Sequence, residues 1–358
     1  MASFILINNK DKHVTVQGAN TMIKHSDKHL IDIPTPNGHA STLALVGDDI
    51  LLAWFGGTKE GEPDVDIYAA RCVNGQWLAP GPIAQQQGLQ HWNPVFYAEG
   101  TRVELYYKVG TPIPSWYTRH MRSFDGGNTW TQPVELVPGD VGGRGPVRNK
   151  PILLRSGLLL APASIEKEET WDAFVDISSD GGVTFTRSDT VPLWRKGHPK
   201  PSNTIHEPFE VTGKGVIQPT LWQSDDGHVH MLLRSTEGVI LRSDSTDEGK
   251  TWCPAYSTGL ANNNSGIDLI KLDDGRIALV MNPVSGNWSA RTPLTLCISC
   301  DGGDSFTNLL NLEVNPGEYS YPAILVRGNT LYISYTWNRL KIAFWEIQLE
   351  PMDGHNTF

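Results

Sequence analysis

Ser123-Phe-Asp-Gly-Gly-Asn-Thr-Trp130 is the first of four copies of one short pattern in this chain of 358 residues. The other copies begin at Ser178, Ser245 and Ser299, and all four fit Ser-x-Asp-x-Gly-x-(Thr/Ser)-(Trp/Phe). Successive copies start 55, 67 and 54 residues apart. Self-similarity at a roughly constant interval is the sequence signature of a repeat architecture. The repeat therefore decides the fold before any single residue is considered.

Each copy has the chemistry of a turn between two strands. Asp caps its own backbone and Gly adopts positive φ without steric cost, while the following Thr or Ser and aromatic residue suit the start of a strand. A degenerate fifth copy, Arg71-Cys-Val-Asn-Gly-Gln-Trp77, keeps the Gly and the Trp but lacks the Asp. At roughly 55–60 residues per unit the chain holds about six units, and propellers carry 4–8 four-stranded blades. We predict an all-β, six-bladed β-propeller. Seven blades are the alternative, because the 67-residue interval contains an insertion.

The composition suits such a fold and excludes several classes of function. The chain is 39% hydrophobic and 19% charged, with 35 Gly and 24 Pro. Its net charge of −10 argues against nonspecific nucleic-acid binding, and no apolar run reaches the ~20 residues of a membrane span. The first residues lack the basic start and apolar core of a signal peptide, which indicates a cytoplasmic protein, or a secreted one if the N-terminus has been trimmed. Cys297-x-x-Cys300 is interpreted as a pair of structural thiols, and no metal site or cofactor is predicted.

The repeated pattern resembles the Asp-box of the sialidase superfamily, a structural motif on the outer edge of a propeller blade. The repeats leave no linker, so residues 1–358 are expected to form one domain. The resemblance implies that a strand from the N-terminus, around residues 3–30, closes the last blade. It indicates the fold and not the chemistry.

The sialidase resemblance also suggests site residues. In sialidases three arginines hold the substrate carboxylate, a Tyr–Glu pair supplies the nucleophile and an Asp is the acid/base, which departs from the usual two-carboxylate rule of glycosidases. Arg234 and Arg291 match the second and third arginines, because each lies just before a box. Tyr319, in Tyr319-Ser-Tyr-Pro322, falls on the nucleophile position. Tyr321 is two residues on and is expected on the same face of a strand.

Two positions depart from the sialidase pattern. His39, in Asn37-Gly-His-Ala-Ser-Thr42, stands where the first arginine is expected. Gln218, before Pro219, stands where the glutamate partner of the tyrosine is expected. An unperturbed phenol has a pKa near ~10 and needs a base before it can attack, and a glutamine cannot be that base. These departures put an ordinary sialidase mechanism in doubt.

The chain as a whole resembles a branch of sialidase-like proteins labelled predicted neuraminidases, over roughly residues 34–342. Some related propellers resemble lyases that remove rhamnose from glucuronate and use a histidine near the chain start, which draws attention to His39. The matching motifs are His39-Ala-Ser-Thr42, Ala53-Trp-Phe-Gly-Gly-Thr-Lys-Glu-Gly61, Asp64-Val-Asp-Ile67, Trp92-Asn-Pro94, Tyr107-Lys-Val-Gly110, Gly145-Pro-Val-Arg-Asn-Lys-Pro151, Asn264-Ser-Gly-Ile-Asp268 and Tyr319-Ser-Tyr-Pro322.

Further polar residues are candidates with two readings each. One reading is a functional role: Asp64 as the acid, with Glu60 and Asp66 beside it; His91 as a second acid/base; Trp92 as a platform for a sugar ring; Arg148, Lys150 and Arg339 as contacts for an anion; Glu166 as a residue facing the axis; and Asn264 and Asp268 as ligand contacts. The other reading is structural, with turn caps, inter-blade ion pairs, a packed tryptophan and a solvated basic loop.

The leading function is a carbohydrate-active enzyme that cleaves a terminal glycosidic bond at or next to an acidic sugar. Uronate elimination needs a cation to neutralise the carboxylate, a base and an acid, roles that suit Arg234 with Arg291, His39, and Tyr319 or Tyr321. An exo-α-sialidase hydrolysing terminal sialic acid and a non-catalytic glycan-binding propeller are the alternatives, since a fold does not dictate a function. The expected partner is an acidic oligosaccharide or glycoconjugate, and the sequence sets no oligomeric state.

Overall fold

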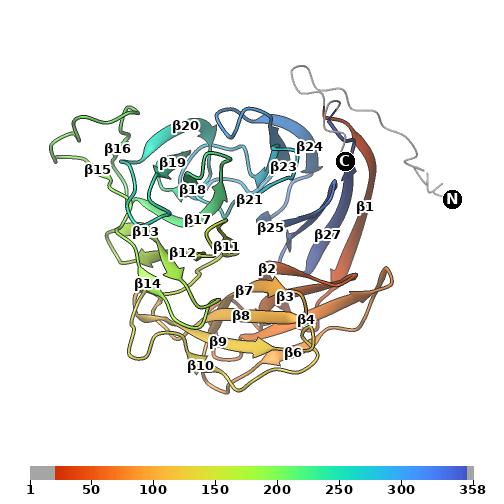
Figure 1. Ribbon diagram of the computed structural model, residues 1–358. Helices are drawn as coiled ribbons and strands as arrows, with labels where there is room; N and C mark the ends of the chain where they lie inside the picture. The colour runs from red at the N-terminus through yellow and green to blue at the C-terminus, as the bar shows by residue number, and fades with distance from the viewer. Residues whose placement is uncertain (1–20, 353–358) are drawn as a thin grey trace.

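The computed structural model describes residues 21–352 as a ring of six antiparallel sheets around one axis (Figure 1). The only helical element in that range is the 3-10 turn η1 (Ile113–Ser115), and no helix there is long and apolar enough to cross a membrane. The prediction of an all-β, six-bladed propeller is confirmed.

Each blade runs outward from an inner strand, and β2, β7, β17, β21 and β25 contact the inner strand of at least one neighbouring blade. The first three blades comprise, in order, β2 (Asn37–Val46), β3 (Asp49–Gly57), β4 (Asp66–Val73), β5 (Gln76–Trp77) and β6 (Gly81–Ala84); β7 (His91–Glu99), β8 (Arg102–Val109), β9 (Tyr117–Ser123) and β10 (Val134–Glu135); and β11 (Ile152–Leu153), β12 (Leu159–Glu166), β13 (Trp171–Ser178) and β14 (Thr186–Arg187).

The remaining three blades follow the same plan, with one insertion. They comprise β17 (Val216–Gln223), β18 (Val229–Ser235), β19 (Val239–Ser245) and β20 (Tyr256–Ala261); β21 (Asp268–Lys271), β22 (Ile277–Met281), β23 (Leu294–Ser299) and β24 (Thr307–Glu313); and β25 (Tyr319–Arg327), β26 (Thr330–Trp337), β27 (Lys341–Leu349) and β1 (Ile23–Asp32). The insertion between the third and fourth blades carries a short parallel pair, β15 (Trp194–Arg195) and β16 (Glu210–Val211), which accounts for the long interval between boxes.

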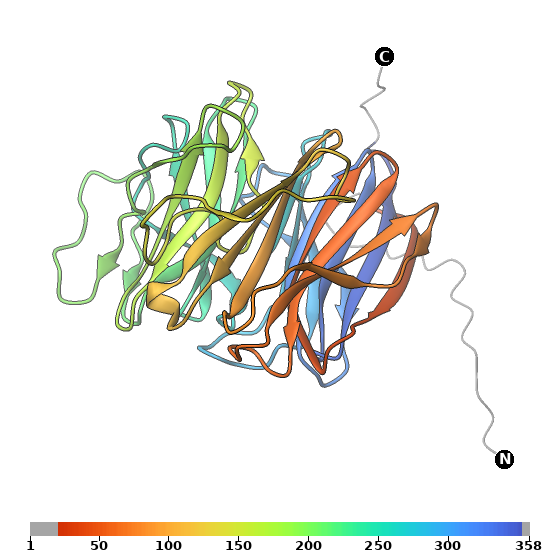
Figure 2. The ribbon, with the colours of Figure 1, turned by 90° about the horizontal axis from the view of Figure 1, so that it is seen from below.

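The ring is joined by the first described strand. β1 pairs antiparallel with β27, with Ile31 opposite Ile342, so it is the outer strand of the last blade. Figure 2 shows β1 in dark red beside the blue strands of that blade. The earlier part of the expected closing segment, residues 3–20, lies outside the described residues.

The four Asp-boxes lie between the third and fourth strands of their blades, away from the axis. In the last box, Asp301 Oδ1 accepts hydrogen bonds from the Ser305 amide at 3.0 Å and the Ser299 hydroxyl at 2.7 Å. Oδ2 accepts from the Ser305 hydroxyl. The boxes at Asp125, Asp180 and Asp247 repeat this pattern. The boxes therefore hold outer turns and leave the chemistry to the inner strands.

The inner strands share a second repeated feature that sequence periodicity does not reveal. Four of them carry a register shift, and a non-glycine residue with positive φ lies within it. These residues are Ala40 (57°), Asn93 (31°), Gln218 (53°) and Tyr321 (55°). Bulges re-aim side chains and are common beside functional sites, and each left-handed non-glycine residue costs roughly 1–3 kcal/mol. The same device in four blades therefore marks the axis as the place to look for a site.

Candidate active site

Tyr321 lies at the centre of a cluster of arginines. The guanidinium carbons of Arg148, Arg234 and Arg291 lie 5.3, 5.6 and 5.5 Å from the centroid of its ring. Arg148 precedes β11, Arg234 is the penultimate residue of β18 and Arg291 precedes β23, so three blades supply the cations and a fourth supplies the ring. Arg234 Nη1 also donates a hydrogen bond of 2.7 Å to the Tyr321 hydroxyl.

Arg234 is buried among neutral partners. Its side chain donates from Nε to Asn264 Oδ1 at 2.8 Å and from Nη1 to Gln218 Oε1 at 2.9 Å, and the residue is 2% exposed. Within residues 21–352 no carboxylate forms a salt bridge with it. A buried cation without a counter-ion is unfavourable and favours the approach of an anion.

Arg148 also lies against the Tyr321 ring and also lacks a paired carboxylate. It is 1% exposed, and Nη2 donates to the Pro322 carbonyl at 2.6 Å, while Nε has no partner among the described residues. Burial lowers the pKa of Arg148 to about 10, although the Asp268 carboxylate nearby opposes the shift. Two buried guanidinium groups beside Tyr321 thus lack a paired carboxylate.

The remaining two arginines are held by acidic residues. Glu318 accepts hydrogen bonds from Arg291 Nη1 at 2.7 Å and from Arg339 Nε at 2.9 Å. Arg339 Nη1 donates to Glu60 Oε2 at 2.6 Å. The chain of charges runs from the fifth blade through the sixth to the first. Sequence reasoning missed Glu318, and its position directly before the Tyr319 segment was the available signal.

His39, near the start of β2, packs against Tyr321. The two ring centroids are 4.2 Å apart, and His39 Nδ1 lies 2.8 Å from Thr336 Oγ1. Among the described residues, no group forms a hydrogen bond with His39 Nε2. Burial, and then the charges of the surrounding arginines, Arg339 first, hold the pKa of His39 well below its usual range. The imidazole is therefore neutral at neutral pH and presents Nε2 as its free nitrogen.

Tyr319 and Tyr321 do not share an environment. The register shift between Ser320 and Ala323, with Tyr321 in the left-handed region, breaks the alternation that would have placed the two tyrosines on one face. Tyr319 is 3% exposed and packs in the core of the blade, with its ring centroid 6.3 Å from that of Trp337. The hydroxyl beside the arginines therefore belongs to Tyr321.

Gln218 hydrogen-bonds to Arg234, and Ser164 links Gln218 to Glu166. Ser164 Oγ donates to Glu166 Oε1 at 3.4 Å and accepts from the backbone N–H of Gln218 at 3.5 Å. Burial raises the pKa of Glu166, against the opposing charges of Arg234 and Lys108. Glu166 is thus a buried carboxyl near the cluster, in a setting that favours its protonated form.

Lys150 is occupied by a structural ion pair. Its Nζ donates to both carboxylate oxygens of Asp268, at 2.9 and 2.8 Å, and to the Leu269 carbonyl. Asp268 also accepts from the Thr220 hydroxyl and the Ile324 amide. Burial lowers the pKa of Lys150, and Asp268 opposes the shift. The pair ties inner strands together beneath the site, and Asn149 secures the Gln218 bulge through the carbonyls of Gln218 and Pro219.

His91 and Trp92 are packed into the interface of the first two blades. His91 Nδ1 donates to the Val65 carbonyl at 2.9 Å, and its ring stacks on Tyr107. Burial lowers the pKa of His91, although Asp66 at 3.6 Å opposes the shift. Trp92 is 8% exposed, contacts the rings of Phe55 and Trp116, and donates from Nε1 to a backbone carbonyl. No face of this tryptophan is free for a sugar ring.

Asp64 lies on the loop before β4. Its Oδ2 accepts from the Thr58 amide at 2.9 Å and from the Thr58 hydroxyl. The hydrogen bond from the Thr58 hydroxyl contributes most to lowering the pKa of Asp64, so the carboxylate is ionised at neutral pH. None of the contacts of the described residues joins Asp64, His91 or Trp92 directly to Tyr321.

Two tryptophans that sequence reasoning did not single out flank Arg234. Its guanidinium carbon lies 5.9 Å from the Trp171 ring and 5.6 Å from the Trp288 ring. Trp288 is 63% exposed, and a 2.7 Å hydrogen bond from Asn264 to Asn287 holds its loop. An exposed aromatic beside a buried cation suits contact with the apolar face of a sugar. The signal was Trp288 in a Gly-Asn-Trp-Ser turn three residues before Arg291.

The fold is that of a sialidase-like six-bladed propeller. The chain belongs to the family described as BNR repeat-like domain, whose model matches residues 48–333. No curated protein matches the chain significantly.

Solved structures share the fold at low sequence identity. A protein of unknown function from Dyadobacter fermentans superposes with a TM-score of 0.70 at 14% identity, over 92% of this chain and 99% of that one. Trypanosoma rangeli sialidase gives 0.67 at 12%, over 90% of this chain and 59% of that one. NanB sialidase from Streptococcus pneumoniae gives 0.66 at 13%, over 89% and 70%. The chain thus spans about three fifths of the length of the trypanosomal sialidase.

Residues 21–352 contain no group of three or more His, Cys, Asp or Glu side chains that could hold a metal ion. The polar groups at the axis are arginines, the carboxyl groups of Glu318 and Glu166, a phenol, an imidazole and amides. Their chemistry is that of anion binding and proton transfer.

Proposed function

We propose that this protein is a carbohydrate-active enzyme that cleaves a terminal glycosidic bond at or next to an acidic sugar. The observation that carries the proposal is the pair of buried guanidinium groups, Arg148 and Arg234, that lie on Tyr321 without a paired carboxylate. A sugar carboxylate that enters the site supplies the missing counter-ion. Fork-shaped guanidinium groups suit a planar carboxylate, so the anion also becomes oriented.

Elimination at a uronate is the reaction that these residues support best. The arginines neutralise the carboxylate, which makes the neighbouring carbon-bound proton acidic. His39 Nε2 accepts that proton, the electrons of the C–H bond form a carbon–carbon double bond, and the bond to the leaving oxygen breaks. The Tyr321 hydroxyl donates its proton to that oxygen. Arg234, which donates to the Tyr321 oxygen at 2.7 Å, stabilises the phenolate that remains.

The electrostatics of His39 support this division of roles. Burial, and then the charges of the arginines, lower the pKa of His39, so the imidazole is present as the free base. A bound carboxylate offsets part of that positive field. The proton affinity of His39 then rises when the substrate is in place, which favours proton abstraction from the bound acidic sugar.

Hydrolysis of a terminal sialic acid is the second candidate, because Tyr321 faces the arginines with its hydroxyl bonded to Arg234. Its difficulty is the base, because Gln218, which accepts a hydrogen bond from Arg234, is a neutral amide. Among the described residues Glu166 hydrogen-bonds to Ser164 and not to Tyr321. A propeller that binds an acidic glycan without turnover would use the same arginines and would not need His39.

Product analysis distinguishes these functions. The purified protein is incubated with sialosides and with uronate-capped oligosaccharides, and products are followed by chromatography and ultraviolet absorbance. We expect an absorbing unsaturated uronate from the uronate substrates, whereas free sialic acid would overturn elimination in favour of hydrolysis. Binding without either product would leave the non-catalytic propeller.

Arg234→Lys and Arg155→Lys form a matched pair for the anion site. Arg155 is a peripheral arginine bonded to the carbonyls of Ser224 and Asp225. Loss of charge-assisted, fork-shaped contacts is expected to weaken binding of the acidic sugar about 10- to 100-fold in Arg234→Lys. Arg155→Lys should bind like the wild type. Equal affinities of all three proteins would contradict the role of Arg234.

A further inference from the structure

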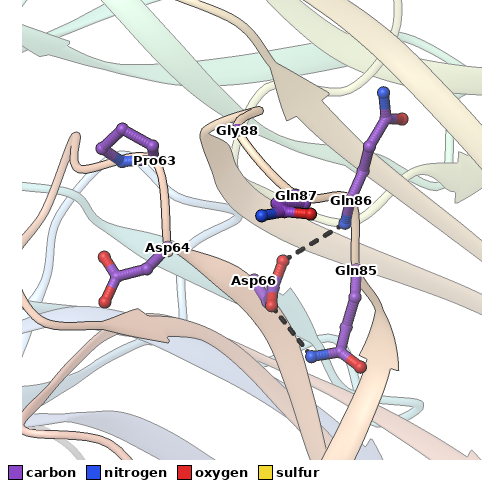
Figure 3. Close-up of a pocket in the computed structure, with 7 residues that line it drawn as sticks. All are labelled: Pro63, Asp64, Asp66, Gln85, Gln86, Gln87 and Gly88. Carbon is purple, nitrogen blue, oxygen red and sulfur yellow. Dashed lines mark hydrogen bonds between the residues drawn. The ribbon is translucent and has the colours of Figure 1, made fainter.

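A cleft lies beside the first blade, and the proposed reaction does not use it. It has a volume of about 600 Å³ and opens between the loop before β4 and the segment that links β6 to β7 (Figure 3). In Figure 3 the three glutamines lie on one side, Pro63 and Asp64 on the other, and Asp66 between them. We call it the Gln–Asp cleft; its lining residues are Pro63, Asp64, Asp66, Gln85, Gln86, Gln87 and Gly88.

The polar groups of the cleft are the carboxylates of Asp64 and Asp66 and the carboxamides of the three glutamines, and they lie among apolar surface. Such groups donate and accept hydrogen bonds in the way that sugar hydroxyls require, with Asp as acceptor only and Gln as both. The two carboxylates in the cleft repel a negatively charged ligand. The ligand that fits is therefore neutral and rich in hydroxyl groups.

The carboxylate of Asp66 is held in place for such contacts. Gln85 Nε2 donates to Asp66 Oδ2 at 2.9 Å, and the backbone N–H of Gln86 donates to Asp66 Oδ1 at 3.4 Å (Figure 3). His91 Nδ1 lies 3.6 Å from Asp66 Oδ1. By contrast, no hydrogen bond within residues 21–352 engages the side-chain amide of Gln87. The cleft thus combines a fixed acceptor with a free amide.

One short loop connects the Gln–Asp cleft to the arginine cluster. Glu60 accepts from Arg339, and Asp64 lies four residues further on in the wall of the cleft. Four residues span at most about 14 Å even when fully extended. The loop is more compact than that, because Glu62 bonds back to Lys59 and Val65 to Glu62. Glu318 joins Arg339 to Arg291, whose guanidinium lies over Tyr321, so this loop is linked to the arginine cluster through a chain of ion pairs. A sugar chain of a few residues with its acidic end at the arginines can extend along that chain toward the cleft.

We propose that the Gln–Asp cleft binds a neutral sugar residue of the substrate, close to the acidic sugar held by the arginines. This inference rests on the proposed function, because it assigns the neutral part of the same ligand. It makes the enzyme selective for acidic sugars joined to a neutral oligosaccharide over the isolated acid.

Calorimetric titrations with three probes test the proposal. The probes are an acidic monosaccharide, the same acid joined to lactose, and lactose alone. We expect the lactose conjugate to bind the wild type at least about tenfold more tightly than the monosaccharide, which corresponds to 1.4 kcal/mol. Gln87→Ala and Asp66→Asn should lose most of that gain and keep the affinity for the monosaccharide. Gln76→Ala, at an exposed glutamine of β5 outside the cleft, is the control and should keep the gain.

The outcomes separate this proposal from the proposed function. Equal affinities for conjugate and monosaccharide in the wild type, or an equal gain in Gln87→Ala and Gln76→Ala, would overturn the assignment of the cleft and leave the anion site standing. Failure of the acidic monosaccharide to bind, together with binding of lactose that Gln87→Ala removes, would overturn the anion site and leave the cleft. Failure of all three probes to bind would overturn both.

Discussion

Arg234 and Tyr321, 87 residues apart in the chain, are joined by a 2.7 Å hydrogen bond from the guanidinium to the phenol oxygen. A guanidinium can only donate, so the tyrosine oxygen is the acceptor and its own proton is directed elsewhere. The bond exists because the bulge in β25 turns Tyr321 toward the axis. This pair therefore links the geometry of the inner strand to the chemistry of the site.

Tyr321→Phe and Tyr319→Phe should separate the two tyrosines. Tyr321→Phe removes the proposed proton donor, and kcat is expected to fall roughly 10²–10⁴-fold, the usual contribution of a general acid. Tyr319 packs in the core of its blade, so Tyr319→Phe keeps the ring and should keep kcat. Steady-state kinetics on the same substrate and thermal melts of both variants make the comparison.

Loss of activity in Tyr319→Phe, with Tyr321→Phe active and both proteins folded, would contradict this placement of the hydroxyl. The nucleophile or acid would then be Tyr319, as the sialidase resemblance suggests.

The Asp-boxes are enough to predict the propeller fold, because the residues that form a turn are adjacent in the sequence. The sequence also leads to Arg234, Arg291, His39 and Gln218, which the structure places around Tyr321. It could not separate Tyr319 from Tyr321. The rule of alternation assumes a regular strand, and a left-handed residue inside β25 breaks it.

Other features of the site depend on contacts between distant segments. Glu318 acquires its role from two arginines in different connections, and Trp288 acquires its role by lying over Arg234. Trp92 looks like a sugar platform in sequence, yet aromatic neighbours from other elements cover it. No periodicity or motif encodes such pairings, so they become visible only in the folded chain.

The burial of His39 should appear in the pH dependence of stability. Its pKa is lowered in the folded state, so the unfolded chain binds the proton first, below pH ~6.5. The stabilisation associated with neutral His39 is complete above that pH and decreases on acidification. The wild type should lose up to about 1.4 kcal/mol of unfolding free energy per pH unit relative to His39→Gln. Urea titrations between pH 7 and pH 5 measure this difference, and parallel curves for the two proteins would refute the account.

The Asp-boxes predict a separate loss of stability at lower pH. Partial burial raises the pKa of Asp301, but hydrogen bonds from Ser305 and Ser299 outweigh it and lower the pKa to about 2. A carboxylate with a lowered pKa stabilises the fold above its unfolded pKa, and this contribution is lost as pH falls from about 4 toward 2. Asp301→Asn should flatten that part of the melting-temperature curve and leave turnover unchanged, since the box is far from the axis. A variant that lost activity while it remained folded would contradict a purely structural box.

Gln218→Glu tests the mechanism at the position where the chain departs most from sialidases. Gln218 Oε1 accepts from Arg234 Nη1 at 2.9 Å, so a glutamate there would form an ion pair with the guanidinium that the substrate carboxylate needs. Affinity for an acidic sugar should therefore fall at least about tenfold, equivalent to 1.4 kcal/mol, and elimination should fall with it. The same carboxylate would give Tyr321 a nearby base, so release of sialic acid should rise only if the tyrosine can act as a nucleophile. Binding and product assays on one protein preparation read both effects. Tighter binding of the acid by Gln218→Glu would contradict Arg234 as its counter-ion, because a new negative charge cannot assist an anion at that distance.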